Sequence, residues 1–351
     1  MKTRCCIIIK NKYIFKDVNY LDYQEQLLKA IEKQMFFEGR KDNLENKEEY
    51  HIGYGIDDNY ARCLGASIAS ICSHNQDQQF VFHILASNLE LKSIEKIEQL
   101  ADEFKINIHL YSINEKVFQQ LPTQEHLPVS TYYRFILPML LKVKKVLYLD
   151  ADIICLGSIQ YLFHLDMADN IVAAVADAET IAHKRNMALN LKNHTYFNAG
   201  VLLINRQKWN DDNVVNKVID ALAGEPKKFR YLDQDALNLI LTGKIYYLDR
   251  IWNRINTTNM NANENIILLH FAAHPKPWNI AWNISDLCNN FTKDLYAHYE
   301  KLSPWKDAEP VLPRNYKEMK NYAKCLLEKG DYIQGFSWYI KYIKTKFSTK
   351  C

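Results

Sequence analysis

The stretch KKVLYLDADIICLGSI, residues 144–159, joins a run of β-forming apolar residues to two aspartates and then to a glycine. Ligands of open parallel sheets bind at the carboxyl ends of the strands. Side chains two positions apart on a strand project to the same side, so Asp150 and Asp152 can hold one hard divalent cation such as Mg²⁺ or Mn²⁺. Acidic pairs at strand ends are also common where they only meet solvent, so this motif needs support from elsewhere in the chain.

The segments around this stretch alternate between short β-rich runs and amphipathic helical runs. The β-rich runs are 51–56, 79–86, 106–113, 144–150, 171–177, 197–205, 244–248 and 265–271. In residues 89–104 the apolar positions recur every three or four residues, at Leu91, Ile94, Ile97, Leu100 and Phe104, which is typical of one face of a helix. This alternation predicts an α/β fold with a mostly parallel sheet and helices on both faces.

The two ends of the chain differ from its middle. Residues 21–50 are charged and helix-prone, and prolines at 304, 310 and 313 mark a boundary before a helical C-terminal piece. We therefore expect an N-terminal extension (1–48), a main domain (49–300) and a C-terminal region (301–351). The C-terminal region holds 11 Lys and Arg against five Asp and Glu, although the whole chain carries only +3. Because the basic residues are not spread through the main domain, a nucleic-acid groove is a poor fit.

Composition limits the class of protein further. Of the 351 residues, 48% are hydrophobic and 24% charged, which is typical of a globular protein. No apolar run approaches the roughly 20 residues needed to cross a bilayer, and CCIII at residues 5–9 is too short for a signal sequence. Eight cysteines show neither a CxxC pair nor zinc-ligand spacing, which favours reduced thiols. These features predict a cytoplasmic location.

Two further stretches place polar residues at the ends of predicted strands. HIGYGIDDNY (51–60) is a strand followed by a glycine-bearing turn and a helix start, an edge that can hold a nucleotide base and its ribose. In NIILLHFAAHPKPW (265–278) an apolar strand delivers His270, and Lys276 follows between two prolines. That spacing suits a third metal ligand beside a phosphate clamp. A histidine at a strand end is, however, more often only a satisfied polar residue.

A fourth stretch, YLDQDALNLI (231–240), begins a helix with Asp233, Gln234 and Asp235. Acidic residues are also common at helix starts, where the dipole favours them. Taken in chain order, GYGIDDNY, YYRFILP, VLYLDAD, FNAGVLLIN, DQDALN and HFAAHPKPW resemble glycosyltransferase family 8, of the kind that adds hexoses to the lipopolysaccharide core. The resemblance runs from about His51 to the C-terminus. It implies a GT-A fold, a UDP-hexose donor and retention of anomeric configuration.

The resemblance also implies roles for individual residues. The implied metal ligands for Mn²⁺ (or Mg²⁺) are Asp150, Asp152 and His270, and Asp150 also counts among the residues that bind the donor. The implied donor contacts are Gly55, Asp57, Asn59 and Tyr60 with uridine; Lys276 with the diphosphate; and Arg134, Asp177, Asn198, Ala199, Asp233 and Gln234 with the donor sugar. Gln234 is implied beside the anomeric carbon, with Asp233 and Asp235 flanking it as catalytic residues. The family's usual glycine three residues after the metal-binding histidine is Ala273 here. An alanine lets the backbone approach phosphate only if its φ is negative.

Two other functions compete with this interpretation. A nucleotidyltransferase making UDP-sugars would share the fold and a metal, but it normally needs a basic, glycine-rich phosphate loop where this chain has GYGIDDNY. A non-catalytic sugar-binding protein on the same fold is the second alternative, because fold does not determine function. Loss of metal ligands would be expected in that case, yet both aspartates and the histidine are present. The sequence leaves open whether the donor is UDP-glucose or UDP-galactose.

The C-terminal segment predicts a further partner. In residues 331–350 one apolar helical stripe is formed by Ile333, Phe336, Ile340, Ile343 and Phe347, with Lys344 and Lys350 flanking it. Such a stripe can hold the enzyme on the cytoplasmic face of the inner membrane, where a lipid-linked core oligosaccharide acceptor would be found. The alternative is that the stripe packs on the main domain.

Overall fold

A large mixed sheet organises the molecule. The structure is a computed structural model that describes residues 23–39, 48–123, 128–191, 195–284 and 288–348. Within these residues the large sheet has eight strands in the order β1-β4-β3-β2-β5-β8-β7-β9. The strands are β1 (Ile31–Glu38), β2 (Glu49–Asp57), β3 (Gln79–Ser87), β4 (Asn107–Ile113), β5 (Lys145–Leu149), β7 (Val172–Ala176), β8 (Phe197–Asn205) and β9 (Ile245–Leu248). Four of the seven pairings between these described strands are parallel, which agrees with the predicted fold class.

A second, smaller sheet leaves the end of β5. It has the order β10-β11-β6 in the described chain, with β10 at Arg254–Ile255, β11 at Leu268–His270 and β6 at Ile153–Cys155. The chain therefore passes from the large sheet to the small one through the three residues 150–152. The DAD motif is the link between the two sheets.

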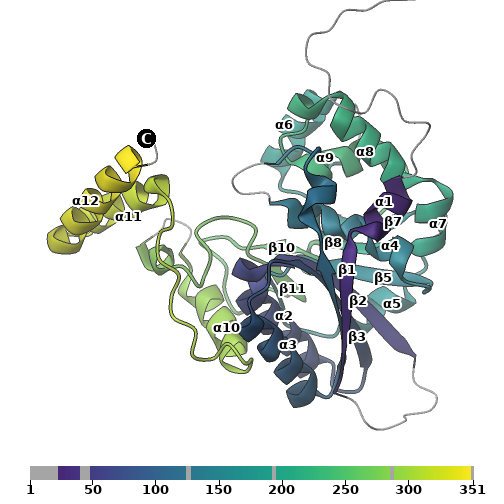
Figure 1. The fold of residues 1–351 in the computed structure, drawn as a ribbon, viewed down its shortest axis with the longest axis horizontal. Coiled ribbons are helices and arrows are strands. Elements are labelled where there is room, and N and C mark those ends of the chain that lie inside the picture. Colours follow the sequence, from purple (N-terminus) through teal and green to yellow (C-terminus); the bar gives the residue numbers. More distant parts are fainter. Residues whose placement is uncertain (1–22, 40–47, 124–127, 192–194, 285–287, 349–351) are drawn as a thin grey trace, which may run out of the picture.

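Helices cover both faces of the large sheet (Figure 1). They are α1 (Tyr23–Lys29), α2 (Ala61–His74), α3 (Leu91–Phe104), α4 (Leu137–Leu140), α5 (Gln160–His164), α6 (Glu179–Leu189), α7 (Arg206–Asp211), α8 (Val214–Gly224), α9 (Leu232–Ile240), α10 (Asn290–Lys301), α11 (Tyr316–Glu328) and α12 (Tyr332–Ser348). Short 3₁₀ turns include η1 (Asp58–Tyr60), η3 (Val129–Phe135), η5 (Arg250–Trp252) and η6 (Ile280–Ile284).

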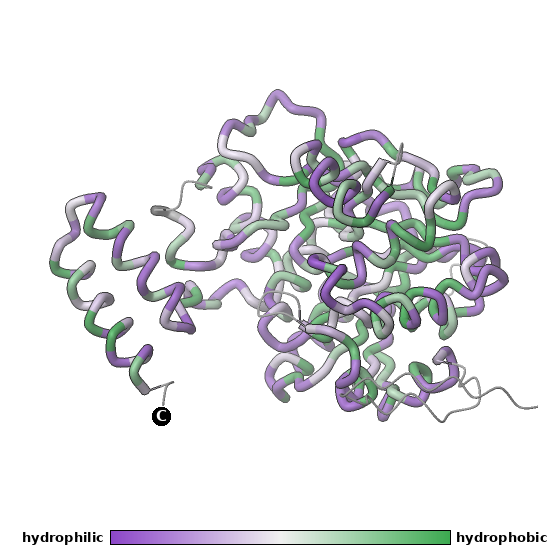
Figure 2. The backbone as a smooth tube through the Cα atoms, turned by 90° about the horizontal axis from the view of Figure 1, so that it is seen from above, coloured by the Kyte–Doolittle hydropathy of each residue, from purple (hydrophilic) through white to green (hydrophobic). Residues whose placement is uncertain are grey.

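The core lies in two layers because successive strand residues face opposite sides. Leu147 and Leu149 of β5 join the cluster under α2 and α3, whereas Val146 and Tyr148 join the cluster under η3, α8 and α9. Burial on both sides explains why VLYL is continuously apolar. The tube in Figure 2 shows the hydrophobic segments gathered inside the main body.

Two sequence predictions about secondary structure need correction. Residues 31–38 lie in the segment predicted to be helix-prone, but they form the edge strand β1, antiparallel to β4. The charges of IEKQMFFE obscured the strand, because no residue of β1 is fully buried and only its Met35 side packs partly, with Phe37, against the core. In the predicted strand 265–271, only Leu268–His270 is extended and paired.

The C-terminal residues form a helical hairpin that stands beside the main body (Figure 1, yellow). Tyr322 and Leu326 of α11 pack on Trp338 of α12, and Ile280 and Ala281 of η6 lie against this small core. Val311, in the connection to α11, exchanges backbone hydrogen bonds with the main domain at Trp278 and Ile280. Among the helices of the described residues, none is both long and apolar enough to span a membrane.

The apolar stripe predicted on the last helix is exposed to solvent. Its exposed fractions are 85% for Ile333, 62% for Phe336, 54% for Ile340, 41% for Ile343 and 64% for Phe347. The face of α12 that is buried carries Trp338 and Tyr342 instead. The stripe therefore does not pack on the main domain. Lys350 lies outside the described residues.

Candidate active site

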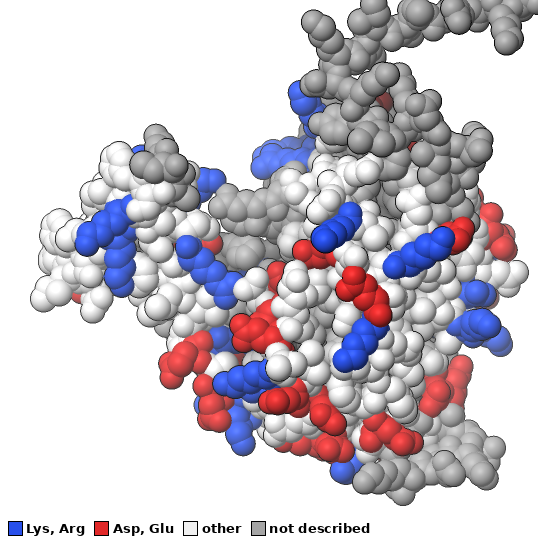
Figure 3. Space-filling view, in the orientation of Figure 1, with Lys and Arg blue, Asp and Glu red and all other residues white. Residues whose placement is uncertain are grey.

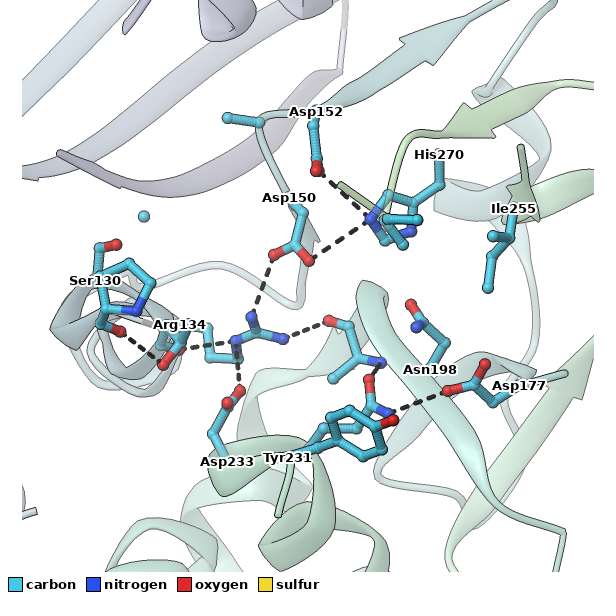
Figure 4. A pocket seen from close by; sticks show the side chains of 18 of the residues that line it. Ser130, Arg134, Asp150, Asp152, Asp177, Asn198, Tyr231, Asp233, Ile255 and His270 are labelled. Atoms are coloured by element: carbon cyan, nitrogen blue, oxygen red, sulfur yellow. Dashed lines mark hydrogen bonds and ion pairs between the residues drawn. The ribbon is translucent and has the colours of Figure 1, made fainter. Parts of the chain in front are cut away.

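A pocket of about 570 Å³ opens where the large and small sheets meet. Its walls come from the end of β2, from η3, from the DAD link, from the start of β8, from α9 and from the segment after β11. The carboxyl ends of the parallel strands β2 and β5 lie at this edge, as expected for a ligand site in such a sheet. Figure 4 shows the side chains that point into the pocket.

The two aspartates of the DAD link meet His270 at the back of this pocket (Figure 4). Strand β11 runs antiparallel to β6 and pairs His270 with Ile153, which brings the imidazole beside Asp152. Nε2 of His270 is 3.3 Å from Oδ1 of Asp152 and 3.8 Å from Oδ2 of Asp150. One ligand atom from each of the three residues lies within 4.8 Å of the others, close enough to bind one ion.

The surroundings of these three residues, the metal triad, fit a divalent cation. Nδ1 of His270 lies 2.9 Å from Oδ1 of Asn253, so Nε2 is left to face the carboxylates. Nζ of Lys276 lies 2.5 Å from Oδ2 of Asp152. Burial would raise the pKa of Asp152, but Lys276 and His270 outweigh burial and lower it, so the carboxylate is ionised. Two carboxylates and one imidazole suit Mn²⁺ well.

Arg134 of η3 links the metal triad to α9. Its Nη2 is 3.1 Å from Oδ1 of Asp150, and its Nε is 3.1 Å from Oδ2 of Asp233. Nη1 donates to the carbonyl oxygen of Ala199, and the guanidinium stacks on the ring of Tyr148. Burial raises the pKa of Asp233 to about 6, against the opposing effect of Arg134. These contacts fix the position of the Arg134 guanidinium in the wall of the pocket.

Gln234 lies on the wall of the pocket that α9 provides. Its Oε1 accepts a hydrogen bond from the backbone N–H of Ala199 at 2.9 Å, which determines the orientation of the amide. Nε2 then donates to Oδ2 of Asp177 at 3.0 Å and to the hydroxyl of Tyr196 at 3.2 Å. Burial raises the pKa of Asp177. Asn198 also lines the pocket.

Asp235 does not flank the pocket, contrary to the expectation from the sequence. It is fully buried, and it does not line the cavity. Arg185 holds both of its oxygens at 2.7 and 2.9 Å, and the hydroxyl of Tyr196 donates to it at 2.6 Å. Positions 233 and 235 are about 200° apart around a helix, so both cannot face one cavity. Asp235 supports Gln234 indirectly, through Tyr196.

The residues predicted to hold a nucleoside lie at the end of β2 and in η1. Gly55 and Tyr60 line the pocket, and Asn59 lines a neighbouring cavity of about 810 Å³ beneath the C-terminal hairpin. Asn59 donates to Oδ2 of Asp57 at 3.1 Å, while Oδ1 of Asp57 is buried and has no hydrogen-bond partner within the described residues. An acceptor oxygen of this kind suits an N–H or O–H of a bound ligand.

Ala273 and Lys276 also line the pocket, and Lys276 contacts the metal triad through Asp152. Ala273 has a negative φ, so the alanine meets the condition under which the backbone can approach a phosphate. The structure thus brings all the predicted residues except Asp57, Asn59 and Asp235 to the lining of one pocket.

Three residues of the site carry no recognisable sequence signal. Tyr148 donates to Oδ1 of Asp150 at 2.9 Å, Asn253 contacts His270, and Tyr196 joins Gln234 to Asp235. Each is a single polar side chain within an apolar or irregular stretch, so no spacing distinguishes it from a core residue. For Tyr148 alone, the spacing of two residues from Asp150 places both side chains on the same strand face, which is compatible with their hydrogen bond.

Comparison with known proteins places the chain in a family. Residues 51–281 match the model of glycosyl transferase family 8, and residues 292–346 match the model of the family 8 C-terminal region. The chain belongs to glycosyl transferase family 8. This glycosyltransferase combines an α/β fold with a candidate metal site that contains a DxD motif.

The most informative relatives act on lipopolysaccharide. A lipopolysaccharide 1,2-glucosyltransferase of Escherichia coli is 32% identical over 85% of this chain and 92% of its own length. A lipopolysaccharide 1,3-galactosyltransferase of Salmonella typhimurium is 31% identical over 85% of this chain and 92% of its own. The crystal structure of the galactosyltransferase LgtC with donor and acceptor sugar analogs matches with a TM-score of 0.63 at 24% identity, covering 72% of this chain and 96% of LgtC. That match supports the GT-A-like fold.

Proposed function

We propose that this family 8 glycosyltransferase is a retaining hexosyltransferase that moves glucose or galactose from a UDP-sugar to a hydroxyl of the lipopolysaccharide core. The observation that carries the proposal is that one pocket joins the metal triad to the polar wall around Gln234. The names and coverage of the bacterial relatives support the acceptor class. Catalysis is assigned to residues 49–300 and attachment to a lipid surface to residues 301–351.

In this proposal the donor lies along the length of the pocket. Gly55, Asp57, Asn59 and Tyr60 bind the uridine, Lys276 and the backbone at Ala273 bind the diphosphate, and Arg134, Asp177, Asn198, Ala199 and Asp233 surround the hexose. A cation held by Asp150, Asp152 and His270 offsets the negative charge that develops on the UDP leaving group. Mn²⁺ is the proposed cation, because the imidazole nitrogen suits it better than Mg²⁺, which is the alternative.

Gln234 is assigned the position beside the anomeric carbon. A retaining transferase needs a nucleophile on the face opposite UDP or a front-face path in which the leaving phosphate guides the acceptor. An amide is a poor nucleophile, and the oxygen of Gln234 is already committed to the N–H of Ala199. The front-face path is therefore favoured, with Gln234 and Asp177 stabilising positive charge on the sugar.

The two alternative functions receive less support from the site. A nucleotidyltransferase requires cations for a triphosphate, yet β2 ends with Asp57 and the turn after it begins with Asp58. A non-catalytic binding protein has no need of a complete metal triad. The deciding experiment offers UDP-glucose and UDP-galactose separately to the full-length protein with truncated core oligosaccharide acceptors. Acceptor-dependent UDP release with an α-linked product is expected from one donor, whereas pyrophosphate-dependent UTP formation or no turnover contradicts the proposal.

The exposed stripe of α12 is proposed to bind an anionic lipid surface. The stripe is unpartnered within the described residues, and the exposed Tyr332 and Tyr339 lie along its edge, where aromatic hydroxyls suit a membrane interface. Lys341, Lys344 and Lys346 are on the same helix, which has no acidic residue. In Figure 3 Lys and Arg predominate on the hairpin, while Asp and Glu gather on the main body. Each basic residue near an anionic surface contributes about 1 kcal/mol, so the attachment is reversible.

A further inference from the structure

Two asparagine side chains connect the hexose end of the pocket with the back of the metal triad. Asn198 is the second residue of β8, Asn253 follows η5, and His270 ends β11. All three are buried, with exposed fractions of 9%, 3% and 3%. Oδ1 of Asn198 lies 2.9 Å from Nδ2 of Asn253, and Oδ1 of Asn253 lies 2.9 Å from Nδ1 of His270. We call these three side chains the amide relay.

One backbone amide determines the direction of every hydrogen bond in the amide relay. The N–H of Gly200 can only donate, and its nitrogen lies 2.9 Å from the side-chain oxygen of Asn198. Because that atom is an oxygen, the atom of Asn253 that faces it must be the NH₂ group. The other end of the Asn253 amide is then its carbonyl oxygen, which can only accept. Nδ1 of His270 must therefore carry the proton.

We propose that Asn253 is a positioning residue that holds His270 as the Nδ1–H tautomer. In that tautomer the lone pair is on Nε2, the atom that lies 3.3 Å from Asp152 and 3.8 Å from Asp150. The opposite tautomer would place a hydrogen where a cation must bind. A hydrogen bond to the distal nitrogen also sets the ring orientation of a metal-binding histidine. The inference rests on the metal site of the proposed function.

The amide relay also connects two parts of the fold. Asn198 belongs to the large sheet, whereas Asn253 directly precedes β10 and His270 ends β11, its parallel neighbour in the small sheet. Asn198 lines the pocket, as Asp177 does, while Asn253 lies behind the lining. The relay therefore aligns the histidine of the metal triad with the wall that faces the donor hexose. Removal of Asn253 leaves the pocket lining intact but frees the imidazole.

The first test measures Mn²⁺ affinity of the full-length protein without donor, from the electron paramagnetic resonance signal of free Mn²⁺. Asn253→Ala is expected to weaken binding roughly 10- to 100-fold. Asn253→Asp keeps an oxygen that accepts from Nδ1–H and is expected to bind more tightly than Asn253→Ala. Asn256→Ala is the matched control: its backbone N–H bonds to the carbonyl of His270, but its side chain has no part in the relay. Its Mn²⁺ affinity should equal that of wild type.

The second test needs no variant of Asn253. Two-bond proton–nitrogen spectra of the wild-type protein labelled with nitrogen-15 histidine distinguish the two tautomers, and His270→Ala assigns the signal. A proton on Nδ1 is expected. A proton on Nε2, or equal Mn²⁺ affinity of folded Asn253→Ala and wild type, overturns the proposal. Failure of the wild-type protein to bind Mn²⁺ counts instead against the proposed metal site, and the tautomer spectrum then decides the role of Asn253.

Discussion

Gly200 lies where the metal triad is most crowded. A Cβ at this position would lie 2.4 Å from Cε1 of His270 and 2.9 Å from Oδ2 of Asp150, closer than side chains can approach. Gly200→Ala is therefore expected to displace the imidazole and to weaken Mn²⁺ binding at least tenfold. Gly224→Ala is the control, since its Cβ would meet no atom within 4 Å, and at the end of α8 it should stabilise the fold by about 0.4–1 kcal/mol. Equal metal affinity of the two variants would contradict the assigned geometry.

Substitution of Gln234 tests the proposed front-face mechanism. Gln234→Ala removes the hydrogen bonds to Asp177 and Tyr196 but no nucleophile, so a few per cent of transfer activity should remain. Gln234→Glu should not restore activity, because a carboxylate there would face the carboxylate of Asp177. Both are measured as steady-state transfer under saturating donor. Complete loss in Gln234→Ala, combined with rescue by glutamate and a trapped glycosyl adduct, would support a covalent path instead.

At the scale of elements, three neighbouring strands carry a row of histidines. Nδ1 of His51 on β2 is 3.0 Å from Nε2 of His83 on β3, and the ring of His83 stacks on that of His109 on β4 at 5.2 Å. Burial is the main cause that lowers the pKa of all three; neighbouring histidines add to it for His51 and His83, and Glu49 opposes it at His51 and His109. Tyr111 and Gln34 complete the polar contacts of this row.

This row predicts how stability depends on pH. A histidine whose folded pKa is lowered stays neutral in the native state, while the unfolded chain takes up a proton below about pH 6.5. Stability is therefore complete above that pH and falls as the pH drops below it, by up to about 1.4 kcal/mol per pH unit for each histidine. Urea unfolding of wild type and His83→Gln at pH 7.5 and 5.5 measures the effect. The variant should lose less stability on acidification, and an equal loss would contradict the assignment.

The elements also show what the sequence could and could not reveal. The strands that are buried on both faces, such as β5 and β8, were predictable because burial forces a continuous apolar run. The edge strand β1 was not predictable, because Met35 and Phe37 are only partly buried against the core and charged residues surround them. The sequence was sufficient to predict metal ligands at Asp150, Asp152 and His270. Their side chains come together, however, only because β11 pairs with β6, and each of these strands has only three residues. Asp235 could have been excluded from the pocket by spacing alone, because it lies about 200° around the helix from Asp233, whereas Asn253 needed the actual side-chain direction.

At the scale of the whole molecule, the hairpin of α11 and α12 is expected to attach the enzyme to lipid. The double variant Ile333→Ser/Ile340→Ser removes two exposed residues of the stripe and should lose binding to phosphatidylglycerol-containing vesicles in sedimentation assays. Leu312→Ser is the control, because Leu312 is 52% exposed but lies before the hairpin. Both variants should keep wild-type donor hydrolysis in solution, and salt should weaken the wild-type attachment. Vesicle binding of the double variant equal to wild type would refute this role.

The metal triad lies where the two sheets meet in the donor pocket, and the proposed reaction depends on a cation bound there. The metal dependence of UDP release is therefore the most direct test. The measurement is UDP release from the active UDP-hexose by wild type and Asp152→Asn, each with Mn²⁺ and with excess EDTA, alongside thermal unfolding of both proteins. We predict release by wild type only with the divalent cation, and none by Asp152→Asn although it remains folded. Full activity of the wild-type protein in excess EDTA, or of Asp152→Asn with Mn²⁺, would contradict the assignment.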